Sequence, residues 1–262
     1  MTDMELLKVE NLHKRFGDLH VLKGVTEHIT QGEVVSVIGP SGGGKSTFLR
    51  CLNLLEIPDE GKIYFEGVDI TDKKVDINVH RQKMGMVFQH FNVFPNMTVG
   101  KNITMAPVLL GKKSQKDADE MAKDLLNRVG LLDKIDEYPK RLSGGQKQRL
   151  TIARALVKKP EILILDDSAS ALDFATDAAL RKSLNRLDWK VTTFLVSQRS
   201  SSIQQADLIL VLDNGTLAGK GTHAELLRTC DTYREIYFSQ FPEERARYSS
   251  VSAGNIMKEV TV

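Results

Sequence analysis

Apolar residues along the chain occur in two alternating patterns. Short apolar runs at residues 34–38, 162–165, 192–196 and 208–212 predict buried strands. Residues 114–130 instead predict an amphipathic helix, because apolar side chains recur there at a spacing of three or four. They are Ala118, Met121, Ala122, Leu125, Leu126 and Val129. A second helix is predicted to begin at Ser143 and to end before Pro160. The alternation predicts an α/β protein with a helical stretch near its middle.

Turn and capping residues refine this outline. Asn214-Gly215 predicts a type I′ hairpin between strands at 208–212 and 216–218. Thr222 and Glu225 have the spacing of a capping box and predict the start of a C-terminal helix. A glycine cluster after the first apolar run precedes a predicted helix at 47–52. We expect a single domain over 1–262. Residues 1–98 and 159–221 form its α/β core, 99–158 a helical subdomain, and 222–262 a C-terminal helix and tail.

The composition excludes several classes of protein. The 262 residues are 41% hydrophobic and 27% charged, an ordinary globular balance. The net charge of +2 is low for a nucleic-acid clamp, so we expect no nucleic-acid partner. No apolar run approaches the ~20 residues that span a bilayer, and the first residues do not resemble a signal peptide. Cys51 and Cys230 are isolated thiols, which favours a reducing compartment. These features predict a soluble cytosolic protein.

The glycine cluster fits a phosphate-binding loop, G-x-x-x-x-G-K-[ST], placed between a predicted strand and a predicted helix. Its candidate binding residues are Gly39, Ser41, Gly42, Gly43, Gly44, Lys45, Ser46 and Thr47. Glycines allow successive backbone N–H groups to converge on one anion, and the helix N-terminus adds partial positive charge. Lys45 is expected to reach the β- and γ-phosphates of a nucleotide, and Ser46 to ligate Mg²⁺.

A second magnesium contact is predicted at Asp166. This acid follows the buried run 162–165, at the end of a predicted strand. A turn aspartate is the alternative interpretation. The phosphate loop earlier in the chain favours the magnesium role.

The pentapeptide Leu142-Ser143-Gly144-Gly145-Gln146, between the phosphate loop and Asp166, resembles the ATP-binding cassette of ABC transporters over about residues 6–240. The resemblance implies a RecA-like P-loop NTPase core with an antiparallel β part and an inserted helical subdomain. It implies ATP and Mg²⁺ as ligands. Gln89 resembles the Q-loop, a catalytic and metal-contacting position, Asp173 the D-loop, and Phe16 the aromatic that stacks on adenine. Core packing for Phe16, a solvated loop for Gln89 and a simple helix cap for Ser143 are the alternatives.

The resemblance also implies partners. In the family, Ser143, Gly144, Gly145 and Gln146 would close over the ATP held by a second cassette, in a homodimer or a heterodimer. A separate transmembrane permease subunit would be driven by that dimer. The chain would then be cytoplasmic and peripheral, on the inner face of the cell membrane.

Two positions depart from the family pattern. Asp167 stands where most cassettes have the Glu that polarises the attacking water, and Gln198 stands where most have a switch His. The shorter Asp and an amide without a titratable proton predict slow hydrolysis with intact ATP binding. Residues 34–103 resemble polar amino-acid importer ATPases, whereas residues from about 162 resemble the degenerate cassette of heterodimeric exporters. The chain therefore reads as a mosaic, natural or engineered.

Three functions are consistent with this sequence. The favoured one is an ATP-hydrolysing subunit that drives a separate permease, with amino-acid uptake as the transport process. A nucleotide-gated clamp with negligible turnover is the second. A non-transport cassette protein is the third, although 262 residues leave no room for a second cassette or a long coiled coil.

Overall fold

The computed structural model describes residues 4–88, 91–166, 189–196 and 203–245. Within them, six strands form one sheet in the order β10-β9-β3-β8-β7-β6. They are β3 (Val34–Ile38), β6 (Met84–Val87), β7 (Ile162–Leu165), β8 (Thr192–Val196), β9 (Leu208–Asp213) and β10 (Thr216–Gly221). All neighbours are parallel except β9 and β10, which form the predicted hairpin. Its turn residues Asn214 and Gly215 have φ of 47° and 83°, as a type I′ turn requires.

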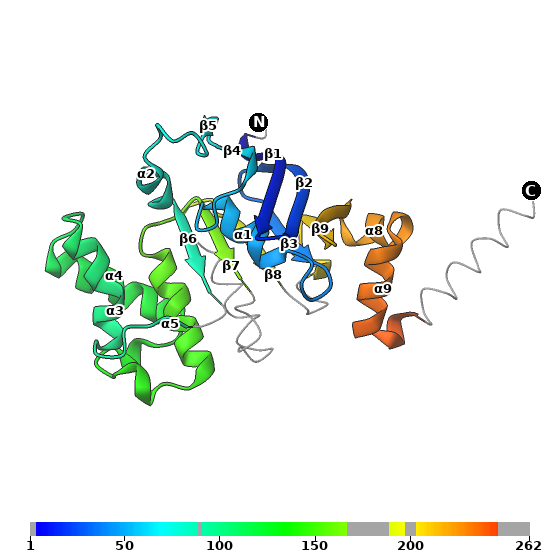
Figure 1. Ribbon diagram of the computed structural model, residues 1–262. Helices are drawn as coiled ribbons and strands as arrows, with labels where there is room; N and C mark the ends of the chain where they lie inside the picture. Colours follow the sequence, from blue (N-terminus) through cyan, green and yellow to red (C-terminus); the bar gives the residue numbers. More distant parts are fainter. Residues whose placement is uncertain (1–3, 89–90, 167–188, 197–202, 246–262) are drawn as a thin grey trace, which may run out of the picture.

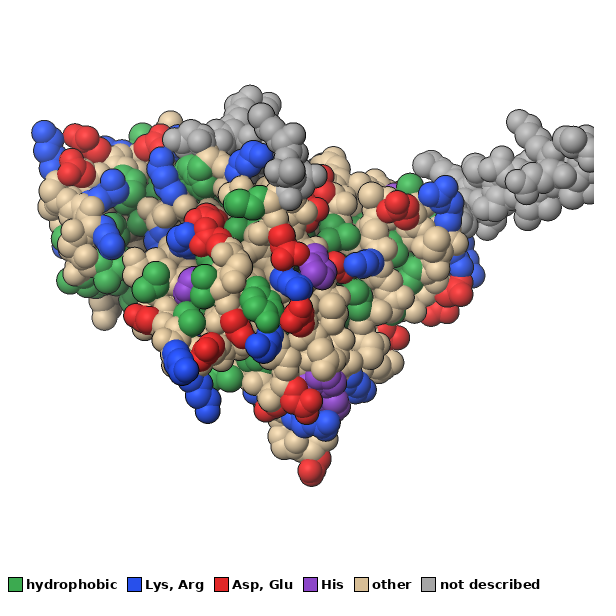
Figure 2. All heavy atoms as spheres, turned by 90° about the horizontal axis from the view of Figure 1, so that it is seen from above, with side chains coloured by type: hydrophobic (Ala, Val, Ile, Leu, Met, Phe, Trp, Pro, Cys, Tyr) green, Lys and Arg blue, Asp and Glu red, His purple; other side chains and the backbone are tan. Residues whose placement is uncertain are grey.

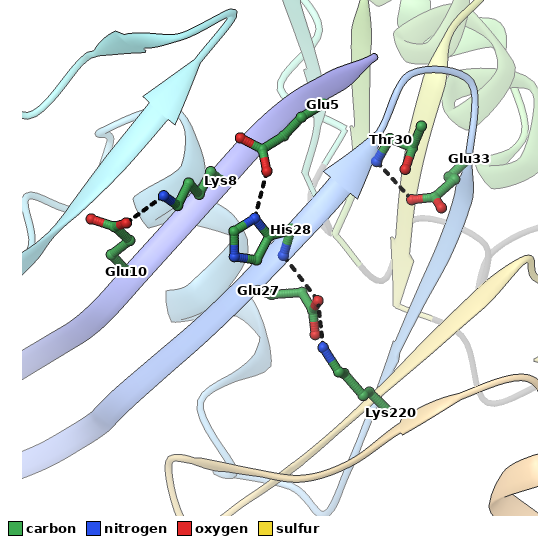
Figure 3. A network of polar contacts seen from close by, with 8 residues as sticks. All are labelled: Glu5, Lys8, Glu10, Glu27, His28, Thr30, Glu33 and Lys220. Carbon is green, nitrogen blue, oxygen red and sulfur yellow. Dashed lines mark hydrogen bonds and ion pairs between the residues drawn. The ribbon is translucent and has the colours of Figure 1, made fainter. Parts of the chain in front are cut away.

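A second, antiparallel sheet has the order β2-β1-β4-β5. Its strands are β1 (Glu5–Phe16), β2 (Leu19–Thr30), β4 (Glu60–Phe65) and β5 (Val68–Asp69). The two sheets are joined by an ion pair at a buried carboxylate, shown in Figure 3. Glu27 on β2, only 3% exposed, accepts hydrogen bonds from Lys220 Nζ on β10 at 3.0 Å and from the His28 backbone N–H at 2.9 Å.

The parallel sheet has apolar packing on both faces. Along β7, Ile162 and Ile164 belong to one core cluster, whereas Leu163 and Leu165 belong to another. The first cluster contains α1 (Lys45–Leu52) and the antiparallel sheet, and the second contains the helices of 99–156. Burial on both faces explains why these strands are continuous apolar runs in the sequence.

Three helices pack on the side of the sheet that carries β6 and β7 (Figure 1). They are α3 (Val99–Leu109), α4 (Gln115–Arg128) and α5 (Gly144–Leu156). Their N-cap hydroxyls belong to Thr98, Ser114 and Ser143, each of which accepts from a backbone N–H of the first turn. The predicted helices at 114–130 and from Ser143 are therefore confirmed.

The opposite side of the molecule carries α8 (His223–Thr229) and α9 (Asp231–Gln240), as Figure 1 shows. Thr222 and Glu225 form the predicted capping box. Tyr233 and Tyr237 of α9 are buried against β9, which places this helix pair on the far edge of the parallel sheet.

The remaining short elements are α2 (Ile77–Arg81), a 3₁₀ turn at Leu132–Lys134 and another at Pro139–Arg141. None of the helices built from the described residues is long and apolar enough to traverse a bilayer. The face seen in Figure 2 carries lysines and arginines interspersed with acidic side chains, in keeping with the small net charge. The described structure confirms the predicted α/β class with an antiparallel part. Two boundaries were wrong: the helix predicted at 47–52 begins at Lys45, and the strand predicted at 216–218 continues to Gly221.

Candidate nucleotide-binding site

The glycine loop connects the C-terminal end of β3 to α1, where parallel α/β sheets bind their ligands. Gly39, Gly42 and Gly44 have φ of 151°, 78° and 96°, a region that favours glycine. A Cβ on Gly39 would lie 1.9 Å from the carbonyl oxygen of Leu212 on β9. The loop therefore requires glycine for its backbone conformation and for its close approach to a neighbouring strand.

The ammonium group of Lys45 lies over this loop. Its Nζ donates hydrogen bonds to the carbonyl oxygens of Gly39 at 2.9 Å and Pro40 at 2.8 Å. Lys45 is also the first residue of α1, so a cation and a helix N-terminus coincide. Both favour an anion at this position. Ser41 and Gly42 are exposed at the same loop, and Thr47 is half-buried.

Ser46 and Asp166 come together across 120 residues of sequence. The Ser46 hydroxyl donates a 2.7 Å hydrogen bond to Asp166 Oδ1 at the end of β7. Asp166 is 1% exposed, and its backbone N–H donates to the Val87 carbonyl oxygen on β6. Because the hydroxyl is the donor in this hydrogen bond, its oxygen lone pairs stay available to a cation. A neutral hydroxyl oxygen beside a carboxylate oxygen is a suitable ligand pair for Mg²⁺, which prefers oxygen ligands.

One member of this cluster was not predicted from the sequence. Arg50, one turn further along α1, places Nη2 3.3 Å from Asp166 Oδ2. The only available signal was its i,i+4 spacing from Ser46, which is common in helices and was not specific enough to identify it.

Phe16 lies at the end of β1 in the hairpin with β2. Its side chain is 45% exposed, so core packing, the alternative interpretation, does not hold. Lys14 Nζ lies 5.0 Å from the ring centroid. The hairpin borders the glycine loop, because a Cβ on Gly44 would lie 3.1 Å from the Val21 carbonyl oxygen on β2.

The LSGGQ segment forms the start of α5. Ser143 Oγ accepts from the Gln146 backbone N–H, while Gln146 Oε1 accepts from the Ser143 backbone N–H at 2.9 Å, a full capping box. Ser143 is therefore a helix cap, a role that its predicted contact with a nucleotide in a second cassette does not exclude. Ser143 and Gly144 are exposed, and Gly145 is half-buried. The helix α5 packs on β6, α3 and α4, within the helical cluster. The helix α1 packs on β2 and β8 instead. The N-termini of α5 and α1 therefore belong to different packing units, the helical cluster and the core around α1. Gln89, Asp167, Asp173 and Gln198 lie outside the described residues.

A groove of about 580 Å³ lies between the helical cluster and the edge of the parallel sheet. Its apolar lining comprises Ile103, Ala106, Pro107, Leu110, Met121, Leu125, Leu156, Val157 and Trp189. Its basic lining comprises Lys83, Lys112, Lys113, Arg128, Arg154, Lys158 and Lys159, beside the acidic Asp124. Burial lowers the pKa of Lys158. The groove is therefore apolar inside and strongly basic at its polar positions, a feature that sequence patterns did not predict.

Comparison with known proteins identifies the family. Residues 22–170 match the family model described as ABC transporter. The chain is 46% identical over 222 residues to the arginine transport ATP-binding protein ArtM of Bacillus subtilis, covering 84% of this chain and 92% of ArtM. It is 41% identical over 244 residues to the glutamine transport ATP-binding protein GlnQ of the same organism, covering 92% of this chain and 96% of GlnQ. Because a single amino-acid transport relative, GlnQ, aligns over 92% of this chain and so over both halves, the mosaic interpretation receives no support.

Solved structures agree. A bacterial Atm1-family ABC exporter with ATP bound has a TM-score of 0.81 at 32% identity, covering 92% of this chain and 42% of that one. The cassette MJ0796, as a dimer in a post-hydrolysis state with ADP and Pi, has a TM-score of 0.75 at 31% identity, covering 83% and 98%. The fold is that of a P-loop NTPase. The chain therefore belongs to the ABC transporter family, as an ATP-binding subunit with ATPase activity.

Proposed function

We propose that this chain is the ATPase subunit of an amino-acid importer. The observation that carries the site is the Ser46 hydroxyl hydrogen-bonded to Asp166, beside a glycine loop whose Gly39 and Pro40 carbonyl oxygens accept from Lys45. The similarity to ArtM and GlnQ, whose names state arginine and glutamine transport, supports a polar amino acid as the transported solute.

Each part of the site then has a role. Lys45 and the glycine-loop N–H groups bind the phosphates, and Phe16 stacks on adenine through its exposed ring. Ser46, Asp166 and Gln89 hold magnesium, which supplies charge neutralisation to the phosphates when bound. Asp167 and Gln198 orient the attacking water and the γ-phosphate, with slower turnover than Glu and His would give.

A dimer completes the nucleotide site. The exposed N-terminus of α5 offers backbone N–H groups and the Ser143 hydroxyl to an anion. It belongs to a different packing unit from the glycine loop, so a second cassette would supply it in trans, with Asp173 at the same interface. The dimeric MJ0796 structure supports this arrangement. The partner is a second copy or another cassette.

The groove between the helices and the sheet supports a permease contact. Its apolar lining suits an amphipathic helix. Lys83 and Arg128 are ion-paired within the chain, so the lysines at 112, 113 and 158 are the lining residues that favour acidic side chains on that helix. In this proposal residues 99–158 form the subdomain that contacts the permease, 1–98 and 159–221 the nucleotide core, and 222–262 the C-terminal helix and tail. The chain would sit on the inner face of the cell membrane.

The nucleotide site is tested with Lys45→Ala. ATP binding, measured by isothermal titration calorimetry with magnesium, should be lost or severely weakened because the loop loses its cation. Lys101→Ala, at an exposed position of α3, is the matched control and should bind as the parent does. Tight ATP binding by Lys45→Ala would refute the assignment of the loop.

The transport role needs a second experiment. The chain is co-expressed with a transmembrane permease subunit, and cells are assayed for uptake of labelled arginine and glutamine, the solutes that the names of ArtM and GlnQ state. Uptake of one of them that depends on Lys45 supports the proposal. Co-purification with ribosomes and without a membrane subunit would favour the non-transport alternative.

A further inference from the structure

We propose that Arg50 is a positioning residue for Asp166. Its guanidinium holds one carboxylate oxygen, so that the other stays directed at Ser46 and the magnesium position. The inference rests on the magnesium site of the proposed function and adds a residue that the family motifs quoted above do not contain.

The geometry places both contacts on one rigid element. Ser46 and Arg50 occupy the same face of α1, four residues apart, and face the end of β7. Ser46 Oγ contacts Oδ1 of Asp166 at 2.7 Å, and Arg50 Nη2 contacts Oδ2 at 3.3 Å. Since each oxygen is engaged from the same helix, rotation of the carboxylate would break both contacts.

Burial and charge also support a positioning role for Arg50. Asp166 is 1% exposed, and a buried carboxylate is costly unless a cation compensates it. Among the described residues, Arg50 is the one that forms an ion pair with Asp166. A guanidinium remains charged at any physiological pH. The Arg50 side chain is 40% exposed, so its own loss of hydration is partial.

The consequence concerns metal affinity. Groups that hydrogen-bond a ligating carboxylate fix its orientation, and their removal typically lowers metal affinity about 10–100-fold. If the guanidinium merely competed with the metal for Asp166, removing it would raise metal affinity. The sign of the change therefore separates positioning from competition.

The test measures binding, with ATP and Mn²⁺ as probes. Calorimetry gives the ATP dissociation constant in EDTA and in saturating Mn²⁺, and the ratio of the two reports how strongly the metal supports ATP binding. For Arg50→Met we expect an unchanged constant in EDTA and a loss of about 10–100-fold in the metal-dependent gain. Arg50→Lys should recover part of the gain. Arg228→Met, at an exposed position of α8, is the control.

A double-mutant cycle with Asp166→Asn completes the design. If Arg50 acts through Asp166, Arg50→Met should change nothing further in the Asp166→Asn background. A full or increased metal-dependent gain in Arg50→Met overturns the inference, as does an equal loss in EDTA. Should Arg50→Met fail to fold, Arg50→Lys and the cycle built with it give the same decision. A parent protein without any metal-dependent gain would instead refute the magnesium site itself.

Discussion

The most direct test of the packing around the LSGGQ helix is Gln148→Met. Gln148 lies on α5, and its side chain is fully buried. Within the part of the chain that the structure describes, neither its Nε2 nor its Oε1 has a hydrogen-bond partner. Met has a similar length without these polar atoms and packs well in irregular apolar sites. We therefore expect the substitution to stabilise the protein.

The magnitude follows from the two unpartnered atoms. A buried polar group without a partner costs about 1–3 kcal/mol, so the amide as a whole costs at least about 2 kcal/mol. Removing the amide should therefore raise the free energy of unfolding by about 2 kcal/mol. For a chain of this size, that increase raises Tm by about 4–8 °C. Gln148 lies on α5 together with Leu150, Ile152 and Ala153, which belong to an apolar core cluster, and a thioether adds no unsatisfied polar group there.

Urea unfolding gives the free energy of unfolding of parent and variant with a common m-value. Gln82→Met, at an exposed position, is the control and should shift stability by less than about 0.5 kcal/mol. A Gln148→Met variant that is less stable than the parent by about 1 kcal/mol or more would refute the reasoning, because it would mean that a bound water satisfies the amide. ATPase activity measured on the same variant shows whether the amide also serves turnover.

Three further predictions concern function and pH. Ser143→Arg should leave ATP binding to the monomer intact but block ATP-dependent dimerisation; equal dimer fractions in size-exclusion chromatography would contradict the composite site. Asp167→Glu combined with Gln198→His should raise steady-state ATP turnover by one to several decades with little change in ATP affinity, since both side chains act on one transition state. A parent protein that turns over as fast as the double variant would contradict the prediction that the parent hydrolyses ATP slowly. Burial beside Tyr233 lowers the pKa of His223 below its usual 6.5, so the folded state prefers the neutral imidazole. Stability should therefore fall as pH drops below about 6.5, and His223→Gln should flatten that fall in urea titrations at pH 7.5 and 5.5; an unchanged slope would contradict it.

Much of this protein could be predicted from its sequence, where the interactions are local. The capping box at Thr222, the helix start at Ser143 and the turn at Asn214-Gly215 each depend on residues no more than three positions apart, so spacing alone identifies them. The buried strands could be predicted because burial on both faces of a parallel sheet produces continuous apolar runs. The glycine loop was visible for a similar reason, since a converging backbone requires glycines at fixed positions.

The tertiary structure decided what depends on distant residues. It placed β3 between β9 and β8, brought Asp166 against Ser46 and Arg50, and paired Glu27 with Lys220 across 193 residues. It also built the basic groove from residues that range from Gln82 to Trp189. Such contacts leave no periodic signal, because an arginine or lysine at an ordinary helical or strand spacing is compatible with many partners. The packing of α1 against the end of the parallel sheet selects Asp166 as the partner of Ser46 and Arg50, and so decides which residues complete the site.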